Sequence, residues 1–103
     1  MELNKIKDLR IYFKRHKYIF IYFYDDWCYN KTIDIDDFFK TKYDLNKIYI
    51  KVNVRSSKKI VNELELTVYP VIRIYKHEEL ISEISCNINN LKNEIEKLYN
   101  FCQ

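Results

Sequence analysis

The sequence predicts an α/β fold in which a mixed central sheet carries helices on both faces. Three observations lead to this fold class. Strand patterns alternate with helical patterns along most of the chain, which favours parallel pairing of the strands. Two later strands follow each other across a tight turn, which indicates an antiparallel hairpin at one edge of the sheet. An amphipathic helix then ends the chain.

The first half of the chain contains four predicted elements. Residues 2–14 place apolar side chains at helical spacing, so we expect an amphipathic helix. Residues 17–24, KYIFIYFY, are continuously aromatic and β-branched, which is typical of a strand covered on both faces. Residues 30–43 favour a helix, although their aspartates weaken its propensity. Residues 47–54, KIYIKVNV, alternate strictly and predict a strand whose isoleucines and valines face one side.

The second half begins with a short helix and a hairpin. Ser56-Ser57 offers an N-cap for a helix over residues 58–65. Residues 70–76 and 79–85 then read as two strands joined by a tight turn at His77-Glu78. The hairpin supplies the antiparallel edge of the predicted sheet.

The terminal helix has an apolar face whose members recur at helical spacing: Ile88, Leu91, Ile95, Leu98 and Cys102. The 103 residues show no linker or internal repeat, so we expect a single domain over residues 1–103. The chain has no glycine, no alanine and one proline. Turns that need a positive φ must therefore use asparagine, histidine or a charged residue, at some energetic cost.

Composition and charge exclude several function classes. The net charge of +3 comes from 18 basic and 15 acidic side chains, whereas a duplex binder is more often strongly basic. No apolar run approaches the ~20 residues that span a bilayer, and no apolar signal segment opens the chain. Three cysteines are too few for a disulfide scaffold or a zinc finger, and they suit a reducing compartment. We expect a cytoplasmic monomer with no nucleic-acid or membrane partner.

Neither a metal nor a cofactor is expected. His16 and His77 are isolated in the sequence, and phosphate-binding loops need glycine. Binding of single-stranded RNA through the ten tyrosines is also disfavoured, because most of the aromatic residues lie in strands or helices that need them for packing.

Cys28 is the residue with the clearest chemical potential. It lies between a predicted strand and a predicted helix, where free amides and the positive end of the helix dipole favour a thiolate. Lys31, one helical turn further on, adds positive charge, while Asp25 and Asp26 oppose the thiolate. We predict a reactive, partly exposed thiol. The alternative is a buried small hydrophobic side chain.

The order of elements, the apolar strand that runs into Trp27-Cys28 and the single later proline together resemble the thioredoxin family over essentially the whole chain. Pro70 opens a strand 42 positions after Cys28. The resemblance implies a thioredoxin-like three-layer α/β/α fold. It implies that Cys28 is the attacking cysteine, that Trp27 packs beside it, and that Pro70 is a cis-proline facing its sulfur and helping to bind extended substrate. Lys51 matches a lysine near the family's active site, and a cis bond after Tyr69 is physically plausible.

The sequence departs from the family at several positions of the same site. Lys31 occupies the position of the second, resolving cysteine. Tyr29 and Asn30 replace a Gly-Pro pair, and Val71 replaces a threonine. Tyr22 stands where the family keeps a buried aspartate that serves the second cysteine. The resemblance therefore implies that the usual dithiol cycle is absent as a unit.

A single thiolate still attacks a disulfide, but it needs a second thiol for its own release. That thiol is glutathione, a thiol of the partner protein, or Cys86. By alignment, Cys86 falls where the family has a glycine lining the substrate groove, which makes it a candidate resolving thiol or a residue that narrows the groove. A bridge requires Cα atoms within about 7 Å. Cys102 is expected to pack in the core.

Two functions remain open from the sequence. In the first, the protein exchanges thiols with protein substrates through mixed disulfides in cell redox homeostasis, as a monothiol thiol-disulfide oxidoreductase if it is an enzyme. In the second, the fold is a non-catalytic adaptor that binds a partner protein. Its contacts would come from aromatic side chains beside Pro70, namely Trp27, Tyr29 and Tyr69.

Overall fold

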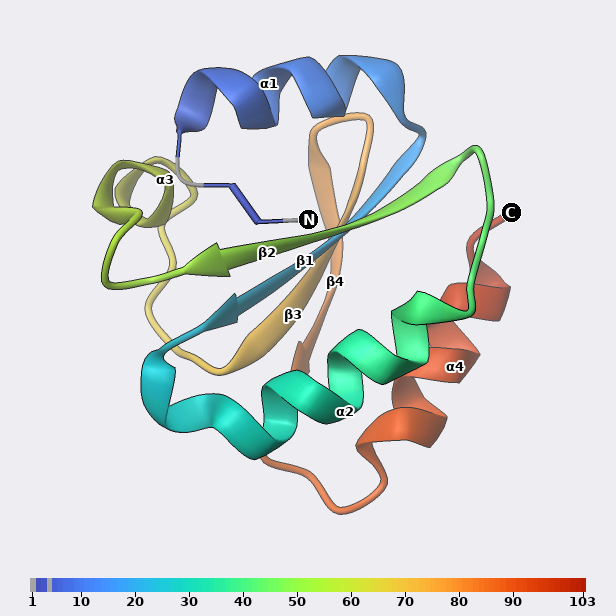
Figure 1. The fold of residues 1–103 in the computed structure, drawn as a ribbon. Coiled ribbons are helices and arrows are strands. Elements are labelled where there is room, and N and C mark those ends of the chain that lie inside the picture. Colours follow the sequence, from blue (N-terminus) through green and yellow to red (C-terminus); the bar gives the residue numbers. More distant parts are fainter. Residues whose placement is uncertain (1, 4) are drawn as a thin grey trace.

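A computed structural model describes residues 2–3 and 5–103 of the chain. It contains a four-stranded sheet with the strand order β2-β1-β3-β4 and helices packed against it (Figure 1). The elements are α1 Ile6–Arg15, β1 Tyr18–Tyr24, a 3-10 turn η1 Asp26–Cys28, α2 Tyr29–Lys40, β2 Lys47–Asn53, α3 Lys58–Glu63, β3 Val71–Lys76, β4 Glu79–Ser85 and α4 Leu91–Phe101.

The sheet combines parallel and antiparallel pairing. β1 runs parallel to β2, with Tyr18 opposite Lys47 and Tyr24 opposite Asn53. β3 runs antiparallel to both β1 and β4. The predicted mixed sheet with a C-terminal antiparallel hairpin is therefore confirmed, and the carboxyl ends of β1 and β2 lie at the same edge of the sheet.

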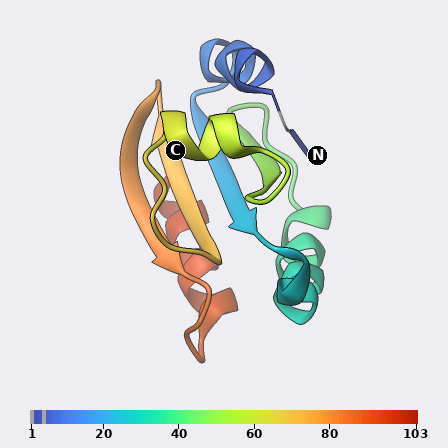
Figure 2. The ribbon, with the colours of Figure 1, turned by 90° about the vertical axis from the view of Figure 1, so that its left-hand side faces the viewer.

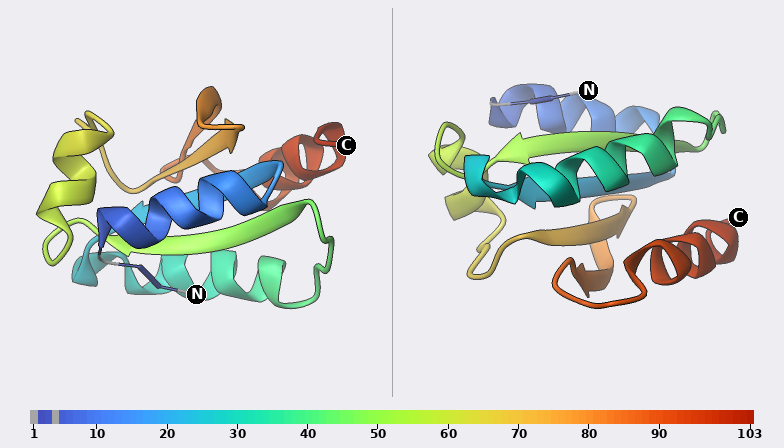
Figure 3. Two further views of the ribbon diagram at one scale, coloured as in Figure 1. Left: turned by 90° about the horizontal axis from the view of Figure 1, so that it is seen from above. Right: turned by 60° about the horizontal axis from the view of Figure 1, so that its bottom comes forward.

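Helices form a layer on each face of the sheet (Figure 2; Figure 3). α1 and α3 pack on the face that contains Ile19, Ile21 and Phe23 of β1. α2 and α4 pack on the opposite face, which contains Phe20 and Tyr22. The continuous apolar run of β1 is thus buried on both faces, as predicted, and the architecture is α/β/α.

The start of the chain differs from the prediction. α1 begins at Ile6 rather than at residue 2. The amide of Leu3 donates to the carbonyl of Lys51 at 2.9 Å, so residues 2–3 lie as extended chain beside β2. Burial of Leu3 in the core explains its apolar character without a helix. Residue 4, which belongs to the predicted helix, lies outside the described residues.

Two other details of the prediction need correction. Ser57 occupies the N-cap position of α3, but its hydroxyl donates to the carbonyl of Leu3 at 3.4 Å and does not cap the helix. α2 ends at Lys40, three residues earlier than predicted, and α4 begins at Leu91 rather than at Ile88.

Turns with positive φ are made without glycine, as the composition predicts. His77 and Glu78 form the two-residue connection of the β3–β4 hairpin with φ values of 49° and 73°. Glu65, after α3, has a φ of 53°. Two-residue hairpins favour such a turn because its twist matches the strands. Each of these residues costs roughly 1–2 kcal/mol relative to glycine.

Candidate functional site

Cys28 lies beyond the carboxyl end of β1, as the last residue of η1 and directly before α2, so it stands between a strand and a helix as the sequence predicts. Its amide donates to the carbonyl of Asp25 at 2.9 Å. Its own carbonyl accepts a hydrogen bond from Thr32 Oγ1 at 3.0 Å, one turn into α2. The backbone of Cys28 is therefore held from both sides, at the position where the first amides of α2 are free.

The predicted partial exposure of Cys28 is wrong. Its side chain is 2% exposed, whereas its neighbours Trp27 and Tyr29 are 63% and 69% exposed. The turn directs the two aromatic side chains to solvent and the thiol into the protein. Attack on an external disulfide therefore requires this turn to open enough to uncover the sulfur atom.

The predicted partner-binding residues come only partly together. The rings of Trp27 and Tyr69 lie 6.4 Å apart, centroid to centroid. Tyr69 is 43% exposed and precedes Pro70 through a cis peptide bond, as predicted. Tyr29 is exposed on the other side of Cys28 and stacks on no other aromatic ring among residues 2–3 and 5–103. Trp27 and Tyr69 thus form an exposed aromatic pair.

The negative charge of Asp25 is balanced by a cationic partner that sequence reasoning missed. Its carboxylate accepts hydrogen bonds from Arg55 Nη2 at 2.8 Å and from the amide of Asp26 at 2.6 Å. Both bonds hold the pKa of Asp25 below its ordinary value. Arg55 comes directly after the end of β2, and the parallel register with β1 brings it beside Asp25. The expected opposition of Asp25 to a thiolate at Cys28 is therefore offset by Arg55.

We predict that Asp25→Asn reduces the loss in the free energy of unfolding that occurs as the pH is lowered into the acid range. A folded-state pKa below the unfolded value of about 3.9 means that the ionised carboxylate stabilises the fold above that value. This contribution is lost as the pH falls through the lowered pKa. Urea unfolding from about pH 2 to pH 7 measures the slope. Asp37→Asn is the matched control, because Asp37 is exposed and has no ion pair within the described residues. An unchanged acid slope in Asp25→Asn would contradict the assignment.

Tyr22 supplies a neutral hydroxyl where the resembled family has an acid. Its hydroxyl lies 3.0 Å from Thr32 Oγ1. Because the single hydroxyl proton of Thr32 goes to the carbonyl of Cys28, Tyr22 is the donor in this contact. Burial raises the pKa of Tyr22, so it stays protonated at neutral pH. Position 22 therefore offers no base for a second thiol.

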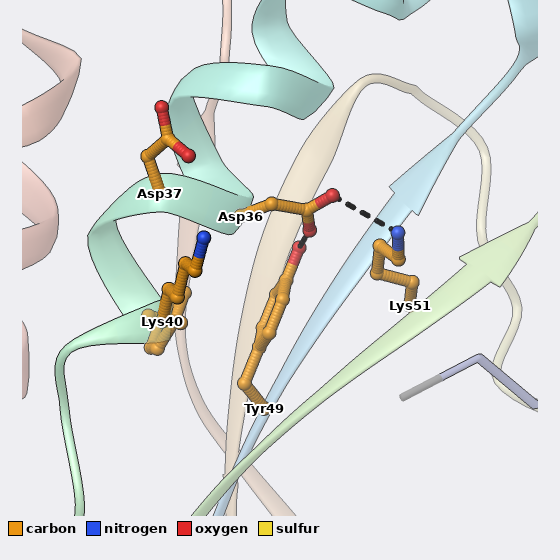
Figure 4. Close-up of a pocket in the computed structure, with 6 residues that line it drawn as sticks. Asp36, Asp37, Lys40, Tyr49 and Lys51 are labelled. Carbon is orange, nitrogen blue, oxygen red and sulfur yellow. Dashed lines mark hydrogen bonds and ion pairs between the residues drawn. The ribbon is translucent and has the colours of Figure 1, made fainter.

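Lys51 binds an acid from α2, which sequence reasoning also missed. Lys51 Nζ donates to Asp36 Oδ2 at 3.0 Å, and the hydroxyl of Tyr49 donates to Asp36 Oδ1 at 2.8 Å (Figure 4). These groups line an open pocket of about 520 Å³ together with Asp37, Phe39 and Lys40. The position of Asp36 in the helix pattern does not predict this contact, because its partners Tyr49 and Lys51 belong to strand β2.

Cys86 follows β4 directly, as predicted, but it does not line an open surface. Its side chain is completely buried, and its amide donates to the carbonyl of Pro70 at 3.1 Å. Burial raises the pKa of Cys86 to about 12, the charge of Lys31 acts in the opposite direction, and the charge of Cys28 raises it further. Cys102 packs in the core with α2 and α4, as predicted. All three cysteines are free thiols.

Other site classes find no support in the described part of the chain. Over residues 2–3 and 5–103, no group of three histidine, cysteine or acidic side chains is placed to hold a metal ion. Within the same residues, no helix has the length and apolar character needed to cross a membrane.

Fold and site together define an α/β domain with a cysteine at a helix N-terminus, an exposed aromatic pair and a cis-proline at the same end of the sheet. No protein-family model matches the sequence, and no curated protein matches it. Solved structures do match over nearly the whole chain. The thioredoxin of Fasciola hepatica has 16% sequence identity and a TM-score of 0.81, with 99% of this chain and 98% of that chain covered.

Two further thioredoxins show the same similarity. That of Schistosoma mansoni has 20% identity and a TM-score of 0.78, covering 99% of this chain and 96% of its own. That of Malassezia sympodialis has 13% identity and a TM-score of 0.82, covering 98% and 90%. The chain therefore has a thioredoxin-like fold, and the resemblance seen in the sequence is confirmed at the level of the fold.

Proposed function

We propose that the protein exchanges thiols and disulfides with protein substrates through Cys28 as its single attacking thiol. The observation that carries this proposal is the position of Cys28 as the N-cap residue of α2, at the positive end of the helix dipole. The exposed pair Trp27 and Tyr69 lies beside it and offers apolar contacts to a substrate chain. Similarity in fold to thioredoxins agrees with this chemistry.

The chemical step is an attack of the Cys28 thiolate on a substrate disulfide. A new sulfur–sulfur bond forms between Cys28 and one substrate sulfur, and the other substrate sulfur leaves as a thiolate that takes up a proton. The helix position that would hold a second thiol carries Lys31. The product is therefore a mixed disulfide, which a further thiol must release. A reducing compartment such as the cytoplasm suits a protein whose three cysteines are free.

The test is capture of partners from cells of the source organism. Protein carrying Cys86→Ser, which removes the candidate resolving thiol, is expected to retain proteins that elute only with reductant, because they are held by a disulfide to Cys28. Adding Cys28→Ser should abolish this fraction entirely, whereas adding Cys102→Ser should keep it, because Cys102 lies at the other end of α4 from the site. The proposal fails if the variant that also carries Cys28→Ser retains the same reductant-released proteins.

A second candidate function is that of a non-catalytic adaptor. The contrast in exposure favours it, since the thiol of Cys28 is 2% exposed while Trp27 and Tyr69 are 63% and 43% exposed. A surface of this kind binds a partner without a covalent step. In the same capture experiment, an adaptor retains partners that elute without reductant, and Cys28→Ser retains them equally well.

A further inference from the structure

We infer that Cys86 is the internal thiol that resolves the mixed disulfide at Cys28. The protein would then complete its cycle through a Cys28–Cys86 disulfide in place of two cysteines on one helix. This inference rests on the proposed function and names the second thiol of the same site.

Hydrogen bonds and core packing place the two cysteines in neighbouring parts of the structure. Cys86 belongs to the same core cluster as Tyr22. The hydroxyl of Tyr22 donates to Thr32 Oγ1 at 3.0 Å, and Thr32 Oγ1 donates to the carbonyl of Cys28 at 3.0 Å. On its other side, the amide of Cys86 binds the carbonyl of Pro70, which fixes the cysteine at the end of β4 nearest the site. Both cysteines are buried, and the register Phe23–Val71–Ser85 across β1, β3 and β4 places them at the same end of the sheet.

Electrostatic effects agree with this geometry. Burial raises the pKa of Cys86, and the charge of Cys28 raises it further. Lys31 lowers the pKa of Cys86, which means that its positive charge favours the Cys86 thiolate. The lysine at the position of the missing second cysteine therefore assists the thiol that we propose as its replacement.

Formation of the mixed disulfide also favours the second step. Once Cys28 is bonded to a substrate sulfur it carries no charge, so its repulsion of a Cys86 thiolate disappears while the attraction of Lys31 remains. The Cys86 thiolate then attacks the sulfur of Cys28. The bond to the substrate breaks, the substrate sulfur leaves as a thiolate and takes up a proton, and the Cys28–Cys86 bond forms.

Electrons balance over the two steps. The substrate disulfide gains two electrons and becomes two thiols, while Cys28 and Cys86 together lose two. An external thiol of the glutathione class reduces the internal disulfide and restores the starting state. Cys102 does not serve this purpose, because it lies at the opposite end of the sheet, where the carbonyl of the next residue, Gln103, accepts hydrogen bonds from Lys17 and Tyr18 at the start of β1.

The test uses dipyridyl disulfide as the probe and the full chain with Cys102→Ser, which leaves two thiols. Attack by Cys28 releases one thiopyridone and leaves a pyridyl adduct on Cys28. Resolution by Cys86 releases a second thiopyridone, and intact mass then shows no adduct and the loss of two hydrogen atoms. With Cys86→Ser added, one thiopyridone is released and the adduct persists. Cys86→Ala repeats this control without a buried hydroxyl, and circular dichroism checks that each variant is folded.

The pH dependence of the second release gives an independent readout. Because burial raises the pKa of Cys86, its thiolate fraction increases with pH through the neutral and mildly alkaline range. The second release is therefore expected to accelerate as the pH rises from about pH 7 to pH 9.

The outcomes separate the two claims. If Cys28 forms no adduct, the proposed function fails and the inference fails with it. If Cys28 forms an adduct that persists in the presence of Cys86, as it does in Cys86→Ser, the proposed function stands and the inference is overturned. Loss of the adduct with a Cys28–Cys86 cross-link found by peptide mapping supports the inference.

Discussion

Replacing Arg73 by alanine is expected to lower the free energy of unfolding by about 3 kcal/mol. The guanidinium of Arg73 is buried in β3, where Nε donates to Glu83 at 2.7 Å. Nη1 donates to the carbonyl of Leu64 at 2.6 Å and to the hydroxyl of Tyr75 at 3.1 Å. Alanine removes all of these bonds and leaves the Leu64 carbonyl without its charged donor. The loss is a large share of the 5–15 kcal/mol that is typical of a domain.

Arg10→Ala is the matched control for this prediction. Arg10 Nη2 pairs with Glu63 at the same distance of 2.7 Å, but the two side chains are 58% and 52% exposed. Water screens an exposed pair, so its removal is expected to cost less than about 1 kcal/mol. Urea unfolding followed by circular dichroism measures both variants. Equal losses in Arg73→Ala and Arg10→Ala would show that burial of the Arg73 contacts adds nothing to stability.

Local periodicity explains why the fold could be predicted from the sequence. The strict alternation over residues 47–54 places Ile50 and Val52 in the core between the sheet and α1, and the structure buries both completely. The hairpin turn at His77-Glu78 was also predictable, because the segments on both sides of it carry strand patterns. These features depend on residues that are close in sequence, and so their spacing reports them directly.

The site was less predictable, because it depends on contacts between distant elements. The pairing of Asp25 with Arg55 follows from the register of β1 against β2, which no local spacing reveals. The burial of Cys28 depends on the conformation of the turn, which directs Trp27 and Tyr29 to solvent and the Cys28 side chain into the protein. Sequence reasoning identified Cys28 as the candidate thiol, but its burial became visible only with the tertiary structure.

Alanine at Trp27 or Tyr69 is expected to weaken the binding of a captured partner by about thirtyfold, the effect of losing one aromatic hot spot of about 2 kcal/mol. The two rings are exposed, contact each other and lie at the end of the sheet where Cys28 is found. They therefore present apolar area that only a partner would bury. The measurement is made in Cys28→Ser, so that no covalent bond contributes to the affinity.

Tyr43→Ala is the control for the removal of an exposed aromatic side chain that lies away from the site. Tyr43 is 87% exposed and precedes β2, whereas Trp27 follows β1, so the parallel strands place them at opposite ends of the sheet. Trp27 is the only tryptophan, and a partner that covers it should shift its fluorescence to shorter wavelength. Titrations of Tyr69→Ala and Tyr43→Ala can therefore be followed by the same signal. If Tyr43→Ala weakens binding as much as Tyr69→Ala, the partner does not dock on the Trp27–Tyr69 pair. If only Tyr69→Ala weakens it, the pair is the docking surface for both the redox and the adaptor function, and Cys28 decides between them.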